Sequence, residues 1–283
     1  MKPLCGIVLA ALAIAPLQRP NPPAVEDPVR VFTDEEATWR LVWADEFDRP
    51  GLPDPERWTY DVGGTGWGNR ESQFYTDART ENARVEGGGL IIEARREDWQ
   101  GSAYTSARLK SRQAWTYARI EVRARLPRGR GTWPAIWMLP LNGIYAKGGW
   151  PDNGEIDIME HVGFDPGVIH GSVHTRAYNH VDRTQRTGRI AVDTAKDDFH
   201  VYRIQWTRRE INAYVDNVRY FTFKNERLTD PHKADWRQWP FDRDFRLLLN
   251  VAVGGNWGGQ KGVDDSIWPQ RMEVDYVRVL QLK

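Results

Sequence analysis

Residues 154–161 read Gly154-Glu155-Ile156-Asp157-Ile158-Met159-Glu160-His161, with three acidic side chains separated only by apolar ones. Residues two apart on a β-strand face the same side, so Glu155 and Asp157 point one way while Ile156 and Ile158 enter a core. Glu160 is out of phase, and a regular strand would bury its charge at a considerable cost in free energy. One extra residue taken up as a β-bulge at Ile158-Met159 would return Glu160 to the face of the other two acids.

Such an alternating segment is also typical of a half-exposed strand whose acidic face is simply solvated. The flanking aromatic residues favour a cleft, because pyranose rings stack on aromatic faces and a solvated acidic face has no need of them. Trp133 and Trp137 precede the acids, and Trp150 lies five residues before Glu155. Two glutamates aimed at one cleft, with an aspartate between them, are the groups that glycoside hydrolysis uses.

The segment Glu155–Glu160 resembles the E-x-D-x-x-E signature of glycoside hydrolase family 16 in its bulged form. That form is found in laminarinases (endo-1,3-β-glucanases), agarases and carrageenases, whereas lichenases and xyloglucan transferases have the unbulged E-x-D-x-E. The resemblance covers the chain from about Trp39 to the C-terminus. It implies that Glu155 is the nucleophile, Glu160 the general acid/base and Asp157 the assisting carboxylate between them.

The chemistry of the cluster agrees with these implied roles. A retaining glycosidase needs its two working carboxyl groups about 5–5.5 Å apart, so we expect a concave sheet that brings Glu155 and Glu160 together. An acid close to two anions is pushed toward its neutral form. The cluster is therefore expected to hold Glu160 protonated near neutral pH, as a general acid requires.

A second motif lies upstream, in a glycine-rich segment. Residues 67–75, Trp-Gly-Asn-Arg-Glu-Ser-Gln-Phe-Tyr, resemble the W-G-N-x-E-x-Q-x-Y stretch of laminarinases, with Ser72 where leucine is common. A glycine-rich loop can also be ordinary turn chemistry. The resemblance favours a sugar-binding loop that presents Trp67, Asn69 and Arg70.

The resemblance implies further substrate contacts. Trp133 and Trp137 are four apart, so a strand places both on one face, where they serve either as core residues or as platforms for pyranose rings. Residues 250–259 resemble the L-N-x-A-V-G-G-N-W-P-G strand and loop, with Gly258 in place of the usual proline, and this suggests Trp257 as a subsite residue. Trp150 joins the set through its position beside the acids.

Two histidines, His170 and His174, share one face of a predicted strand. A zinc pair is possible in principle, but no further Cys or His is spaced to complete a site of that kind. The resemblance instead implies that His174 lies beside the acid/base on a neighbouring strand.

Composition limits the partners and the redox chemistry. The 283 residues carry 39 basic and 39 acidic side chains, so no net charge draws the chain to nucleic acid or to an anionic membrane. The only cysteine is Cys5, in the N-terminal segment, so the domain is expected to lack disulfides. We expect a monomer that needs no cofactor for catalysis and has a β-glucan polysaccharide as its partner.

The N-terminus has the pattern of an export signal. Lys2 precedes a mostly apolar run that ends at Leu17 and is too short to span a bilayer, so residues 1–17 are predicted to be a signal peptide. Residues 18–36 contain four prolines and are predicted to be a linker. The expected catalytic domain is 37–283, secreted to the periplasm or the exterior and free of the membrane after processing.

Many short alternating segments separated by turn residues predict an all-β fold. The expected strands include Leu90–Ala94, Ala118–Leu126, Val168–Thr175, Phe199–Trp206, Ile211–Asp216, Tyr220–Phe223, Phe245–Val253 and Met272–Leu280. Helical periodicity is nearly absent, with at most a short turn within 230–239. This spacing predicts a single β-jelly-roll sandwich of two curved antiparallel sheets with a concave cleft.

The resemblance also suggests a structural calcium on the convex face. The matching positions are Glu46, the carbonyl of Gly88 and Asp275, which are hard oxygen donors of the kind that calcium prefers. Glu46 and Asp275 are equally consistent with ordinary surface acids.

The function implied by the resemblance is that of a secreted, retaining, endo-acting 1,3-β-glucanase. The alternatives are another family 16 activity (mixed-linkage glucanase, agarase, carrageenase or transglycosylase) and a non-catalytic β-glucan-binding lectin. Lectins on this scaffold usually lose the carboxylates, and here all three are present.

Overall fold

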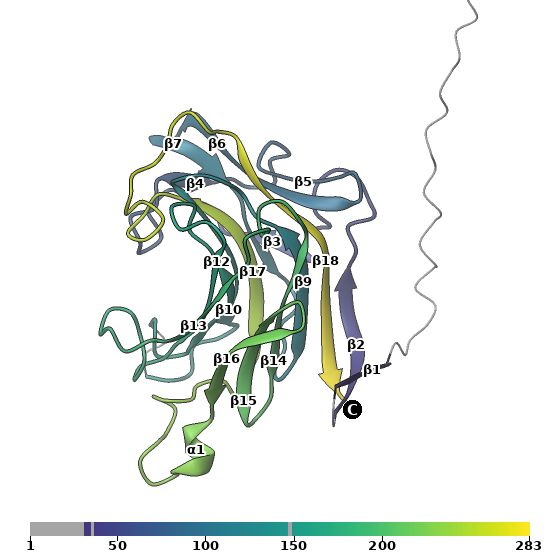
Figure 1. Ribbon diagram of the computed structural model, residues 1–283, viewed down its shortest axis with the longest axis vertical. Coiled ribbons are helices and arrows are strands. Elements are labelled where there is room, and N and C mark those ends of the chain that lie inside the picture. Colours follow the sequence, from purple (N-terminus) through teal and green to yellow (C-terminus); the bar gives the residue numbers. More distant parts are fainter. Residues whose placement is uncertain (1–30, 35–36, 147–148) are drawn as a thin grey trace, which may run out of the picture.

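The computed structural model describes residues 31–34, 37–146 and 149–283, and nearly all of its regular structure is β-strand (Figure 1). In chain order the elements are β1 (Val31–Asp34), β2 (Ala37–Asp45), β3 (Trp58–Tyr60), β4 (Gln73–Tyr75), β5 (Ala83–Glu86), β6 (Gly89–Trp99), β7 (Ser102–Ser106), β8 (Arg108–Ser111), β9 (Arg119–Arg125), β10 (Thr132–Pro140), β11 (Glu155–Glu160), β12 (Val168–His174), β13 (Arg186–Ala191), β14 (His200–Trp206), β15 (Glu210–Val215), β16 (Val218–Lys224), α1 (Glu226–Thr229), β17 (Phe245–Val253) and β18 (Gln270–Leu282).

The strands form two curved sheets packed face to face. The larger sheet has eleven strands in the order β16-β15-β14-β9-β18-β6-β7-β4, with β1, β2 and β5 attached beside this path. The smaller has seven, in the order β13-β12-β11-β10-β17-β8-β3, and it lines the hollow side of the molecule in Figure 1. The predicted all-β jelly-roll sandwich is confirmed.

Three details differ from the expectations. Strand β4 lies parallel to β7, because β5 and β6 intervene along the chain and return it to the same end of the sheet. Strand β1 pairs with β2 and falls within residues 18–36, the expected linker. Helix α1 is one short turn just before the turns of residues 230–239, and no helix in the described ranges is long and apolar enough to cross a membrane. The expected signal peptide lies outside the described residues.

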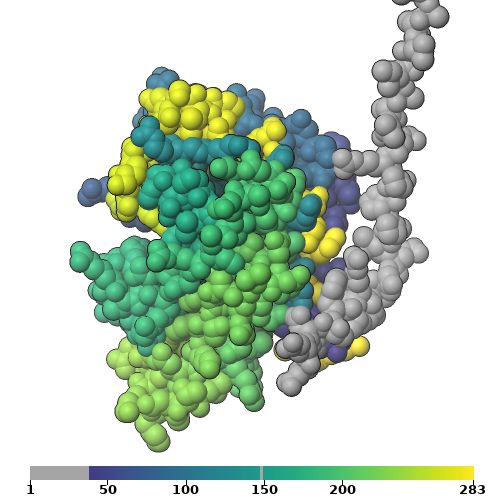
Figure 2. Space-filling model, viewed as in Figure 1, coloured from purple at the N-terminus to yellow at the C-terminus, as the bar shows by residue number. Residues whose placement is uncertain are grey.

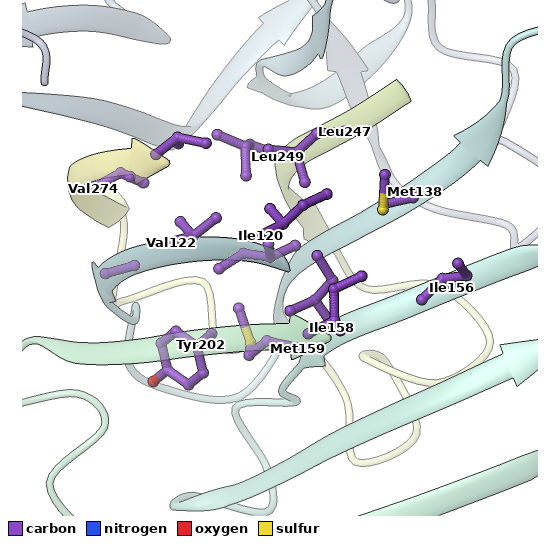
Figure 3. Close-up of a cluster of buried hydrophobic side chains, with 14 of the residues drawn as sticks. Ile120, Val122, Met138, Ile156, Ile158, Met159, Tyr202, Leu247, Leu249 and Val274 are labelled. Carbon is purple, nitrogen blue, oxygen red and sulfur yellow. The ribbon is translucent and has the colours of Figure 1, made fainter. Parts of the chain in front are cut away.

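The hydrophobic core fills the space between the two sheets. Ile120 and Val122 of β9 enter it from the larger sheet and meet Leu247 and Leu249 of β17 from the smaller one (Figure 3). These side chains are fully buried. The alternation along each strand therefore determines which side chains the opposite face presents to the cleft.

Within its paired stretch, strand β11 has one residue more than the facing segments of β10 and β12. Against β10, Met159 pairs with Ile136 and Asp157 with Trp137, so two adjacent partners correspond to positions two apart on β11. Against β12, three steps from Asp157 to Glu160 match only two steps of the partner. Ile158 and Met159 are both fully buried, although they are adjacent. The predicted β-bulge is confirmed, and it turns Glu160 back to the face of Asp157.

Removing Met159 tests the function of this extra residue. The deletion leaves Glu-Ile-Asp-Ile-Glu, a regular strand that still places all three acids on one face. We expect a folded protein with its carboxylates in the cleft, destabilised by about 2–5 kcal/mol for the lost core side chain. Urea unfolding and a crystal structure would measure both effects.

Deleting Ile156 is the matched control. It shortens the strand by the same amount, but it puts Glu155 out of phase with Asp157, so this variant should not fold cooperatively. A folded Met159 deletion variant with Glu160 pointing into the core would contradict the analysis.

Candidate active site

The three acids of β11 face the hollow side of the smaller sheet. Asp157 is buried, at 3% exposure, and Glu155 and Glu160 at the two ends of the strand are half-buried. The preceding Gly154 has a φ of 88°, and a Cβ there would lie 2.8 Å from Phe241 Cε1, so glycine is required where the strand begins. In the space-filling view the outline is notched between the yellow loop after β17 and the teal loops around β11–β13 (Figure 2).

Each glutamate accepts a hydrogen bond from a tryptophan. The indole Nε1 of Trp150 donates to Glu155 Oε2 at 3.0 Å, and Nε1 of Trp133 donates to Glu160 Oε1 at 3.0 Å. Trp150 is 43% exposed, and its ring lies 4.9 Å from that of His180 between centroids. Trp133, an expected platform residue, and Trp150, an expected substrate contact, are therefore also the donors that fix the two outer carboxylates.

His174 lies at the opposite end of the acid strand from the expected position. The register pairs His174 with Glu155, and His170 with Glu160. Nε2 of His174 is 3.3 Å from Asp157 Oδ2 and 3.8 Å from Glu155 Oε1. The prediction that His174 lies beside the acid/base is wrong, because strands β11 and β12 are antiparallel and His174 ends β12 where β11 begins.

Burial raises the pKa of all three carboxyl groups, to about 8 in each case. For Glu155 and Glu160 this value already includes repulsion from Asp157, which raises the pKa, and the His174 charge and the indole hydrogen bonds, which lower it. The cluster therefore retains protons to a higher pH than isolated carboxyl groups do. This direction agrees with the expectation that Glu160 is protonated near neutral pH.

A fourth carboxylate, Glu71, lies on one wall of the site and was not predicted. It accepts hydrogen bonds from Asn69 Nδ2 at 3.2 Å, Gln73 Nε2 at 2.7 Å and Tyr75 Oη at 3.3 Å. Burial raises its pKa against these bonds, and its charge in turn raises the pKa of Glu160. Glu71 occupies the glutamate position of the W-G-N-x-E-x-Q-x-Y motif, so the sequence did contain a signal for this residue.

Arg108 joins the glycine-rich loop to the sheet. Its guanidinium group lies over the rings of both Trp67 and Trp137, at 4.7 Å and 4.6 Å from their centroids. Trp137 also donates to Asn250 Oδ1 at 2.7 Å. The faces of Trp67 and Trp137 that Arg108 covers are not open to a sugar ring. No sequence pattern pointed to Arg108. The fold places it between Trp67, 41 positions before it, and Trp137, 29 positions after it.

The last predicted contacts fall into two groups. Trp257 packs edge-on against Trp133, with ring centroids 5.5 Å apart, and against His170 at 4.9 Å, so it borders the Glu160 end of the site. Arg70 is exposed, with a φ of 57°, and no hydrogen bond or ion pair to another described residue holds its side chain. The structure thus groups Trp257 with the acids but leaves Arg70 at the surface.

Comparisons with known proteins agree on the kind of protein. The model of glycosyl hydrolases family 16 matches residues 70–278. The chain is 64% identical to a β-glucanase of Rhodothermus marinus over 249 residues, 87% of each chain. It is 39% identical to a glucan endo-1,3-β-glucosidase of Cryptopygus antarcticus, covering 85% of this chain and 91% of that one.

A solved structure is equally similar. The laminarinase from Rhodothermus marinus superposes with a TM-score of 0.86 at 63% identity, covering 88% of this chain and 99% of that one. Both the fold and the length of the domain are therefore shared.

The raised pKa of Asp157 makes stability depend on pH. The folded protein holds this proton to about pH 8 and the unfolded chain only to about 3.8, so the free energy of unfolding falls as pH rises between these values. Asp157→Asn cannot ionise and keeps the shape. We expect it to gain stability over the wild type progressively above pH 4, by up to about 1.4 kcal/mol per pH unit. Urea unfolding at pH 4, 6 and 8 measures this, and a difference that is the same at all three would contradict it.

Proposed function

The chain belongs to glycosyl hydrolases family 16, and from this premise we propose that it is a retaining, endo-acting 1,3-β-glucanase. The observation that supports the proposal most strongly is the bulged strand β11, whose two outer glutamates are each fixed by a tryptophan N–H. The fold of the chain and its β-glucan-degrading relatives also support a β-glucan substrate. The proposal includes secretion, which is expected from residues 1–17, because an enzyme that degrades a polysaccharide outside the cell must be exported.

The arrangement suits a double displacement. The carboxylate of Glu155 attacks the anomeric carbon, while the carboxylic acid of Glu160 gives its proton to the departing glycosidic oxygen. The Glu160 carboxylate then takes a proton from water, which attacks the same carbon and releases Glu155. Burial raises the pKa of Asp157, and while Asp157 holds its proton the repulsion that raises the pKa of Glu155 is absent.

The tryptophan donors contribute through geometry. The hydrogen bond from Trp150 holds Oε2 of Glu155 in a fixed position, and Oε1 remains free to attack. Trp133 fixes Glu160 in the same way, and it packs against Trp257 at that end of the site. Fixed carboxylates need no reorganisation when charge develops on the sugar, and this is how preorganised groups lower a barrier.

The products formed from laminarin test the proposal. We expect internal cleavage to short 1,3-linked oligosaccharides, slower attack on lichenan and none on cellulose, with the β anomer formed first because two inversions restore the configuration. Proton NMR of the early products shows the anomer directly. Glu155→Ser is the control, and it should bind laminarin without turnover.

Two results would overturn parts of this proposal separately. An initial α product would exclude the two-step mechanism. Agarose or lichenan strongly preferred over laminarin would leave the mechanism standing and change the substrate.

We also propose a structural calcium at Glu46, Gly88 and Asp275, and the strand register supports it. Strand β18 pairs with β6 up to Val274 and with β2 from Val277, so Asp275 lies where β2 ends and β6 begins. Glu46 directly follows the last paired residue of β2, and Gly88 directly precedes β6. The hard oxygen donors fit calcium.

The two carboxylates at this position already pair with cationic side chains. Both oxygens of Glu46 accept from Arg278 at 2.8 Å, and Asp275 accepts from Arg123 at 2.6 Å, so guanidinium groups now supply the positive charge. Calcium would have to displace Arg278 from Glu46.

If calcium binds there, it should raise the melting temperature, and a chelator should lower it, because a ligand of the folded state stabilises that state. Differential scanning fluorimetry with added calcium or EDTA measures the shift. In Arg278→Ala the response to calcium should be larger, since no guanidinium competes. A melting temperature indifferent to calcium in both proteins would count against the site.

A further inference from the structure

The Glu155 end of β11 gathers a set of donor atoms suited to a metal ion. Glu155, Asp157 and His174 each offer one donor atom, and the three atoms lie within 4.8 Å of one another. Two of the separations are shorter, since His174 Nε2 is 3.3 Å from Asp157 Oδ2 and 3.8 Å from Glu155 Oε1. The set combines one imidazole nitrogen with two carboxylate oxygens.

These separations match a zinc coordination shell. Ligand atoms about 2.0–2.1 Å from a tetrahedral Zn²⁺ lie about 3.3–3.4 Å from one another. The two distances from His174, 3.3 Å and 3.8 Å, need little or no contraction to reach that value, and the donor atoms of Glu155 and Asp157 lie within 4.8 Å of each other. Imidazole nitrogen and carboxylate oxygen are ordinary zinc ligands, and a site with three protein ligands keeps its fourth position for water.

One ligand atom also has no hydrogen bond, although His174 Nε2 lies 3.3 Å from it. Asp157 is 97% buried, and no described residue gives its Oδ2 a hydrogen bond. A buried carboxylate oxygen without a donor is costly, so an ion that binds it gains the free energy of satisfying it. The acidic cluster therefore comes with an independent observation that points to a cation.

We propose that Glu155, Asp157 and His174 form a binding site for Zn²⁺, and that bound Zn²⁺ blocks the glycosidase reaction. A zinc ion held by Glu155 would occupy the carboxylate that must attack the sugar, so metal and turnover exclude each other. Sequence spacing concealed this site. No further Cys or His is spaced along the sequence to complete a site with His170 and His174, whereas the antiparallel register of β11 and β12 supplies two carboxylates beside His174.

The direct test is isothermal titration calorimetry with ZnCl₂ on protein freed of metal by EDTA and desalting. We expect one zinc ion per chain in the wild type. Loss of one ligand in His174→Ala or Asp157→Asn should weaken binding by at least the roughly tenfold to hundredfold that loss of a group supporting a ligand costs. His232→Asn is the matched control, because His232 is exposed on the loop after α1 and away from the cluster. Its affinity should equal that of the wild type.

A second measurement keeps the proposal falsifiable if a variant folds poorly. Anomalous scattering from a zinc-soaked wild-type crystal should place one ion among the three side chains. Absence of binding to the wild type below about 1 mM zinc, or unchanged affinity in both ligand variants, would overturn the proposal.

Activity provides the link to function. Zinc should inhibit laminarin hydrolysis in competition with substrate, and EDTA should restore the rate. Binding is measured without substrate, so a protein that binds zinc at these residues but does not cleave laminarin would refute the proposed function and leave this inference intact. Zinc binding at the cluster without inhibition would overturn the claim that the metal blocks turnover.

Discussion

The extra residue in strand β11 is the constraint on which the site depends. The strand must bury Ile156, Ile158 and Met159 between the two sheets while presenting acids to the hollow side. A regular alternation cannot do both with this sequence, because Glu160 would follow the isoleucines into the core. The bulge resolves the conflict for both neighbouring strands at once, since β10 and β12 each skip one residue opposite it.

The same arrangement makes the site costly for stability. Three carboxyl groups on six residues are buried together, and burial raises the pKa of each one. Two indole N–H groups and one imidazole offset part of this cost. Glu155 and Glu160 are only half-buried, so contact with solvent in the cleft offsets a further part. A group that must change its protonation state during a reaction is best held in such a balance. The fold tolerates it because a large apolar core lies directly beneath.

Arginine has a comparable role on the wall beside the acids. Arg108 lies between two tryptophan rings and forms an ion pair with Asp61 at 3.1 Å, so a buried charge is neutralised and a loop is attached to the sheet by the same side chain. Glu71 and its three donors continue this wall. The tryptophans expected to contact sugars thus form two groups. Trp133 and Trp150 donate hydrogen bonds to the glutamates, whereas Trp67 and Trp137 are covered by the Arg108 guanidinium group. Trp67 and Trp137 each have one face covered, and Trp150 remains open to solvent.

The sequence by itself determined the fold class, the bulge and the position of the three acids. The bulge and the acids depend on periodicity within one short segment, and the fold class depends on the same alternation repeated along the chain. Periodicity is a local property that apolar and charged residues reveal directly. Tertiary structure alone decided which carboxylate His174 faces and that Arg108 covers two of the tryptophans. These are contacts between segments far apart in the chain, and they depend on strand order and register. Neither leaves a pattern in any one segment, because a register shift of one residue would exchange every partner without altering the alternation that specifies the strand.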